Sequence, residues 1–160
     1  MKLDKILVPL DGSTLAESAI AKAVEVAGDR SVTLLLLRAA EVHTLPGMDP
    51  TEAQVEVVRE AEEYLATVAA GLKRQGIKGV ETSVWYGPAA AAIVDAARLR
   101  KADMIVMSTH GRSGLGRLIL GSVAESVLHG TTTPILLLRA PEAPVEVPRG
   151  AAASRVDARV

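Results

Sequence analysis

Short apolar runs alternate along this chain with longer stretches in which apolar residues recur at helical spacing. Continuous apolar runs are typical of parallel strands that are covered on both faces, whereas spacings of three and four residues indicate helices with one buried face. The pattern predicts strands over residues 6–10, 32–37, 80–85, 103–107 and 134–138. It predicts helices over about residues 14–27, 51–75, 88–99 and 123–128.

Strands that alternate with helices in this way predict an α/β fold, a doubly wound open parallel five-stranded sheet with helices on both faces. In such sheets ligands bind beyond the carboxyl ends of the strands, where the winding reverses direction. Two loops with suitable chemistry, residues 9–13 and 108–122, follow the first and fourth strands. A strand order of 3-2-1-4-5 would place both loops beside one crevice.

Polar residues at three predicted helix starts have the spacing of capping boxes, in which a hydroxyl and a Glu or Gln satisfy free N–H groups of the first turn. These are residues 14–17 (Thr-x-x-Glu), 51–54 (Thr-x-x-Gln) and 122–125 (Ser-x-x-Glu). Gly76 is predicted to end the long helix, because glycine readily adopts the backbone conformation of a helix stop.

The loop at residues 108–122 is rich in glycine and connects a predicted strand to a predicted helix. Such a loop can bring backbone N–H groups against a phosphate, and the positive end of the helix dipole adds to the attraction. A P-loop would need Lys and Ser or Thr directly after Gly116, where Arg117-Leu118 stand instead. The dinucleotide fingerprint would need its last glycine at Ile119. Both motifs are excluded.

What remains in this loop is Gly111, nine residues, and then Gly121-Ser122, with Ser108 three places before Gly111. This joint spacing favours phosphate binding over two unrelated turn glycines. It resembles the nucleotide motif of the universal stress protein family, G-x-x-G, nine residues, G-[S/T], with Ser108 in place of the first glycine.

The resemblance extends over the whole predicted domain. The opening residues 6–13 and the closing residues 133–138 also look like the family, so that it covers roughly residues 3–139. It implies the strand order 3-2-1-4-5 and an ATP-binding regulatory domain of the stress response, with at most slow ATP hydrolysis. It also implies a homodimer joined through residues 134–138, an apolar edge strand that could pair with its symmetry mate.

By the same resemblance, one group of residues would hold the phosphates of ATP. Ser122 and the backbone at Val123 would contact the phosphates, Gly111 and Gly121 would let the chain approach them, and Arg112 would add positive charge. Ser122 also has a purely structural interpretation, since its hydroxyl could cap the following helix.

A second group would hold the nucleoside. The resemblance places Asp11 against the ribose or adenine, and contact with a metal such as Mg²⁺ or Mn²⁺ is a lesser alternative. Asp followed by Gly is also typical of an ordinary turn. The backbone of Ala39, just after the second strand, would read the adenine edge, and Pro9 would supply an aliphatic wall. Ser108 could bring its backbone to a ribose or phosphate, but its side chain could also crowd the site.

Composition narrows the possible partners. The chain has 160 residues, 49% of them hydrophobic and 23% charged, which suits one globular domain. A net charge of -1 and only 2% aromatic residues provide neither the positive charge nor the stacking side chains that nucleic-acid binding uses. The absence of cysteine fits a reducing cytoplasm, and no apolar run approaches the roughly 20 residues that span a bilayer. We expect a cytoplasmic domain over residues 1–140 and a disordered tail over residues 141–160.

No catalytic constellation can be identified in the sequence. His110 lies in the glycine loop without a carboxylate or nucleophile at a recognisable spacing, and His43 and His129 show no spacing typical of metal ligands. An adenylating or phosphoryl-transfer enzyme therefore has no support. Two hypotheses remain, an ATP-binding regulatory domain and a structural or interaction protein of the same fold that has lost the nucleotide, with Ser108 as the first sign of that loss.

Overall fold

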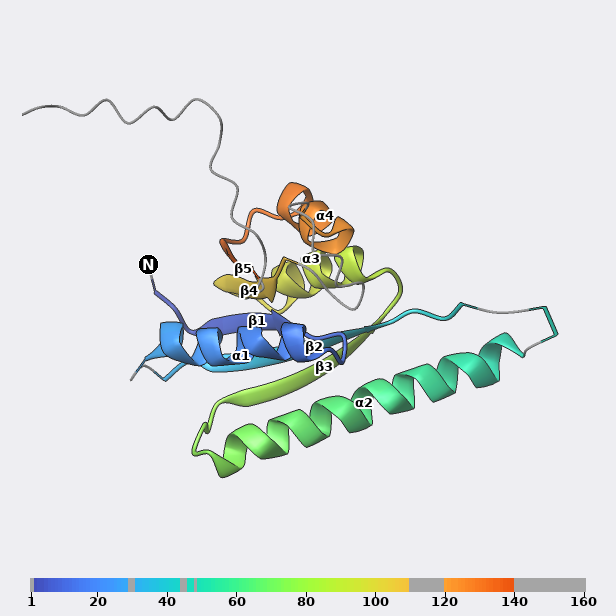
Figure 1. Cartoon of the computed structure of the whole chain (residues 1–160), viewed down its shortest axis with the longest axis horizontal. Coiled ribbons are helices and arrows are strands. Elements are labelled where there is room, and N and C mark those ends of the chain that lie inside the picture. The colour runs from blue at the N-terminus through green and yellow to red at the C-terminus, as the bar shows by residue number, and fades with distance from the viewer. Residues whose placement is uncertain (1, 29–30, 44–45, 48, 110–119, 140–160) are drawn as a thin grey trace, which may run out of the picture.

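The strands of this protein form one five-stranded parallel sheet of order β3-β2-β1-β4-β5, which confirms the predicted fold class and strand order (Figure 1). The computed structural model describes residues 2–28, 31–43, 46–47, 49–109 and 120–139, so that the predicted tail lies outside the described residues. The elements in chain order are β1 (Lys5–Pro9), α1 (Thr14–Ala27), β2 (Thr33–Ala40), α2 (Pro50–Arg74), β3 (Val80–Tyr86), α3 (Ala89–Leu99), β4 (Met104–Ser108), α4 (Ser122–Gly130) and β5 (Ile135–Leu138).

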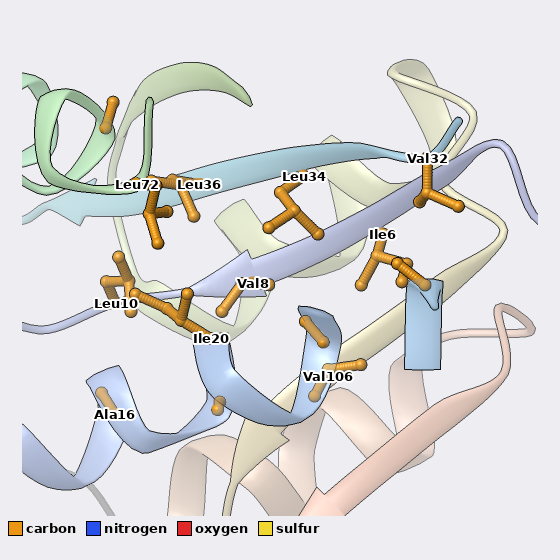
Figure 2. Packing of buried hydrophobic residues seen from close by; sticks show 14 of the residues in the cluster. Ile6, Val8, Leu10, Ala16, Ile20, Val32, Leu34, Leu36, Leu72 and Val106 are labelled. Carbon is orange, nitrogen blue, oxygen red and sulfur yellow. The ribbon is translucent and has the colours of Figure 1, made fainter. Parts of the chain in front are cut away.

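Two hydrophobic clusters lie on opposite faces of the sheet, because successive side chains of each strand point to opposite sides. On the first face Ile6, Val8 and Leu36 pack with residues of α1 and α2 (Figure 2). On the second face Leu7 and Leu37 pack with residues of α3 and α4. Both faces of the central strands are therefore covered, which explains why their sequences are apolar throughout.

The first two helices begin at a different cap from the one predicted. Ser13 caps α1, and its side-chain oxygen accepts an N–H of the first turn at 3.1 Å. Asp49 caps α2 and is followed by Pro50, which suits a first helical position because it has no N–H to satisfy. The predicted caps Thr14 and Thr51 are wrong, since both already lie within the first turn.

Only the carboxyl-terminal part of the long helix α2 packs against the sheet. Its buried residues are Ala61, Leu65, Ala69 and Leu72. Residues 51–60 are exposed or half-buried, and Figure 1 shows this end of α2 projecting beyond the strands. The position of the helix therefore depends on few side chains.

The end of α2 agrees with the prediction. Gln75 caps the helix, and Gly76 follows with a φ of +92°, a conformation that side chains other than hydrogen disfavour. The chain then turns back into β3.

Asp103 connects the starts of β1 and β4. Its Oδ2 atom accepts the N–H groups of Asp4 and Lys5, each at 2.8 Å, and its own N–H donates to the carbonyl of Lys5 at 2.9 Å. We expect Asp103→Ala to lower the free energy of unfolding by about 2 kcal/mol, because two N–H groups lose a charged acceptor. Urea denaturation measures this. Asp95→Ala, which removes an exposed ion pair to Arg98, serves as the control and should change stability by less than about 0.5 kcal/mol.

Candidate functional site

The winding of the sheet reverses between β1 and β4, which lie side by side at its centre. From β1 the chain moves outward through β2 and β3, and it then returns to the other side of β1 to form β4 and β5. The segment after β1 leads to α1 on the first face, whereas the segment after β4 leads to α4 on the second. Both segments start at the same carboxyl edge, where ligands bind in folds of this type.

The segment after β1 forms a tight turn organised by Asp11. Its Oδ1 atom accepts the N–H of Ser13 at 2.9 Å and the hydroxyl of Ser13 at 2.6 Å, and Ser13 in turn caps α1. Gly12 between them has a φ of +85°, which explains the glycine. Asp11 therefore has the structural role expected of an Asp-Gly turn.

A positively charged side chain lies beside this turn. The guanidinium of Arg38, from β2, is 4.8 Å from the ring centroid of Tyr64 and lies about 3.8 Å from where a Cβ on Gly12 would stand. The Tyr64 hydroxyl donates to Glu17 on α1 at 2.7 Å. Partial burial, together with this hydrogen bond, raises the pKa of Tyr64 well above its usual value. The tyrosine therefore remains neutral and holds Arg38 against its ring.

The amino-terminal end of α4 presents backbone donors at the same edge. Gly121 caps the helix, its N–H donates to the carbonyl of Thr109 at 2.8 Å, and its carbonyl accepts the N–H of Glu125 at 2.9 Å. The N–H groups of Ser122, Val123 and Ala124 precede the first helical hydrogen bond, so that the helix supplies them with no carbonyl. They lie where the helix dipole is most positive.

The interpretation of Ser122 as the cap of this helix does not hold. Ser122 is the first helical residue, and the N–H of Glu125 that it was expected to satisfy is bonded to the backbone of Gly121. The side chain of Ser122 is exposed at the helix start. Its hydroxyl is therefore not required for capping.

The end of β4 is buried. Ser108 is 7% exposed and pairs with Leu138, and the N–H of Thr109 donates to the Leu138 carbonyl at 2.8 Å. Val106, two residues before Ser108, belongs to the first-face cluster. By the alternation of the strand, the side chain of Ser108 faces α1 rather than α4.

Pro9 and Ala39 end up on the second face, the face of α4. Pro9 follows Leu7 and Ala39 follows Leu37 in the strand alternation, and both residues are half-buried. Ala39 was expected just after its strand, but β2 continues to Ala40 because its pairing with β3 extends that far. The predicted strand end at residue 37 was therefore too early, and Ala39 lies within β2 rather than after it.

The structure brings most of the predicted site residues to one edge. Seven of them lie at the carboxyl ends of β1, β2 and β4 or at the start of α4, namely Pro9, Asp11, Ala39, Ser108, Gly121, Ser122 and Val123. Gly111 and Arg112 lie outside the described residues.

Some chemistry is absent from the residues that the structure describes. Nowhere among them do three His, Asp or Glu side chains gather closely enough to hold a metal ion. None of their helices combines the length and the apolar character needed to cross a membrane.

Comparison with known proteins agrees with this architecture. The model of the universal stress protein family matches residues 2–139. The chain belongs to this family. Universal stress protein MJ0531 of Methanocaldococcus jannaschii is 33% identical over 143 residues, which cover 86% of this chain and 83% of that protein. Universal stress protein Rv2005c of Mycobacterium tuberculosis is 34% identical over 139 residues, which cover 84% of this chain but 45% of that protein.

Solved structures share the fold. The hypothetical protein MJ0577 superimposes with a TM-score of 0.78 at 25% identity, covering 88% of this chain and 98% of that one. A family member from Arabidopsis thaliana solved with AMP bound has a TM-score of 0.62 at 17% identity and covers 89% and 97% of the two chains. A universal stress protein in complex with cAMP has a TM-score of 0.58 at 22% identity and covers 84% and 96%. At identities below 25%, such likeness establishes the fold alone.

Proposed function

We propose that this protein is an ATP-binding regulatory domain whose nucleotide lies at the carboxyl edge of the sheet, between the β1–α1 turn and the start of α4. The observation that carries the proposal is the set of backbone N–H groups at Ser122, Val123 and Ala124, which face an edge where the winding reverses. Three such donors at the positive end of a helix suit the oxygens of a phosphate.

The conformation of Gly121 supports a ligand there. Its φ of −61° and ψ of 148° are accessible to any residue, so that the backbone itself does not require glycine. A glycine also makes no side-chain cap, whereas Ser or Asp would stabilise the helix better. The absence of a Cβ at this position would let a phosphate approach the backbone closely.

The other predicted residues take roles consistent with their places. Ser122 and Val123 would hold phosphates, with Gly111 and Arg112 completing the loop, while Asp11, Pro9 and Ala39 would surround the nucleoside. Mg²⁺ or Mn²⁺ would accompany the triphosphate, and it would neutralise phosphate charge there. AMP and cAMP, which two structural relatives bind, share the adenosine that this site is proposed to hold.

The proposed role is regulation in the cytoplasm by nucleotide occupancy, with at most slow hydrolysis. The loop offers no Lys followed by Ser or Thr to hold a magnesium-bound triphosphate for transfer, and the carboxylate of Asp11 is engaged in the turn after β1. Occupancy would instead stabilise one arrangement of the two loops.

The alternative function is a domain of the same fold that binds no nucleotide. The serine at position 108 favours this alternative, because the family motif has glycine there. Its side chain faces α1, however, on the sheet face opposite α4, so that it does not project toward the proposed phosphate site. We therefore prefer the nucleotide-binding proposal.

Mass spectrometry of the purified protein after denaturation tests the proposal. Release of ATP or AMP in a near-stoichiometric amount is the expected result. If no nucleotide is released, and isothermal titration with Mg-ATP also shows no binding, the proposal is wrong and the alternative stands.

A homodimer through β5 is a further expectation. All four residues of this edge strand are half-buried in the single chain, and one side of its backbone has no neighbouring strand in the described sheet. Pairing with the same strand of a second copy would satisfy these groups. Analytical ultracentrifugation at micromolar concentration should give twice the chain mass, and a monomer over the whole range would contradict the expectation.

A further inference from the structure

We infer that Trp85 forms a wall of the base end of the nucleotide site. The inference rests on the proposed function. It extends that function to Trp85, one of very few aromatic residues of the chain, to which the sequence alone assigned no role.

The first step is the direction of the nucleotide. Phosphates held at the start of α4 lie on the second face of the sheet, next to the ends of β4 and β1. A nucleoside that extends from there along the carboxyl edge of the described sheet first passes the end of β1, where the β1–α1 turn begins. It then reaches the end of β2. The strands are roughly 4.8 Å apart, so that each strand crossed brings the base that much closer to β3.

The second step is the register of β2 and β3. Ala39 is paired directly with Trp85, and paired residues of parallel strands project to the same face. Trp85 packs against the second-face cluster, the cluster that α3 and α4 cover. Its side chain therefore lies on the same face as the start of α4, directly beside Ala39.

The third step is the local shape. Ala39 contributes only a methyl group, whereas its neighbour is the largest side chain of the chain. The indole is held in place, because its Nε1–H donates to the Ser83 hydroxyl at 3.0 Å and its ring is half-buried. The methyl group of Ala39 is too small to block a flat heterocycle from contacting this fixed ring. Base–aromatic contacts of this kind contribute substantially to nucleotide binding.

The chain offers a direct measurement, since Trp85 is its only tryptophan. ATP should change the fluorescence of the native protein with the same midpoint that calorimetry gives. Inorganic tripolyphosphate should bind but leave the emission unchanged, because it fills the phosphate site alone. If tripolyphosphate changes the emission as ATP does, the response comes from the phosphate loop and the inference is wrong.

Variants give the second readout. Trp85→Leu should weaken ATP about tenfold, the size of a lost base–aromatic contact, and leave tripolyphosphate binding unchanged. Trp85→Phe should bind ATP nearly as the parent does. Tyr86→Leu is the matched control, because Tyr86 is the next residue, points to the opposite face and is 59% exposed.

The outcomes separate the two proposals. If the parent binds neither ATP nor tripolyphosphate, the proposed function fails. ATP could also bind without changing the emission, and with the same affinity for Trp85→Leu as for the parent. In that case the proposed function stands and the role of Trp85 is wrong. Should Trp85→Leu fail to fold, the fluorescence titrations of the native protein with ATP and tripolyphosphate still decide.

Discussion

Replacing Gly121 by valine is expected to weaken ATP binding at least about a hundredfold, a loss of roughly 3 kcal/mol, while the domain stays folded. The backbone of Gly121 is extended, so that valine can adopt its conformation, and the hydrogen bond from its N–H to Thr109 can persist. The added side chain would nevertheless occupy the space through which a phosphate reaches Ser122 and Val123. The folding cost should be limited to about 1 kcal/mol, the difference between Gly and an aliphatic residue at a helix cap.

Isothermal titration with Mg-ATP and thermal melting without nucleotide measure the two effects. Ser126→Val is the matched control, because it places the same side chain on the exposed surface of α4 beyond its first turn. The loss of ATP affinity in Ser122→Ala should lie between the losses in these two variants. The substitution removes one hydrogen bond to a charged group, worth about 1.5 to 3 kcal/mol. Equal affinity of the parent and Gly121→Val would show that the glycine serves only the loop.

Ser108→Gly completes the series. Because the side chain of Ser108 faces α1, the substitution should leave the affinity nearly unchanged. Binding that appears only in Ser108→Gly would show instead that the serine has closed the site, and the alternative function would then apply to the native chain.

The sheet could be predicted from the sequence because its strands are apolar on both faces. Runs such as residues 32–37 are explained by one physical situation, a parallel strand covered by helices on either side. Periodicity alone could not predict the strand order. That prediction came from the family resemblance and from the expectation that the loops at residues 9–13 and 108–122 lie beside one crevice. Both sources of information were correct in this case.

The helix caps were less predictable, because several polar residues compete at each helix start. Asp11, Ser13 and Thr14 all precede or begin α1, and only the hydrogen bonds of the folded turn show that Ser13 caps the helix and Asp11 supports Ser13. Similarly, Gly121 rather than Ser122 caps α4, since the carbonyl of Gly121 accepts the N–H of Glu125 and its own N–H donates to the carbonyl of Thr109.

The group of Arg38, Tyr64 and Glu17 was missed for a different reason. Its members come from β2, α2 and α1, and no spacing along the chain relates them. The only local signal was a charged residue directly after the buried run of β2, at the carboxyl end where ligands bind. Contacts that depend on tertiary packing of this kind leave no periodic pattern.

Leu65→Ala is expected to have the largest effect on stability, lowering the free energy of unfolding by about 2 to 5 kcal/mol. Leu65 is 0% exposed and lies in the middle of the part of α2 that packs against the sheet. The opposite end of this helix projects beyond the strands, so that its residues cannot compensate for the cavity. The large cost follows from how few side chains hold α2.

Val55→Ala on the same helix provides the comparison, because Val55 is 63% exposed and alanine is the better helix former. Its unfolding free energy should change by less than about 0.5 kcal/mol. In thermal melting, Leu65→Ala should lower Tm by roughly 3 °C for each kcal/mol lost. If both variants melted within a degree of the parent, α2 would contribute little to folding, and the sheet would have to be stable with its first face partly uncovered. The buried row of Ala61, Leu65, Ala69 and Leu72 argues against that result, since α2 packs against both β2 and β3 and truncating a fully buried leucine leaves a cavity between the helix and the sheet.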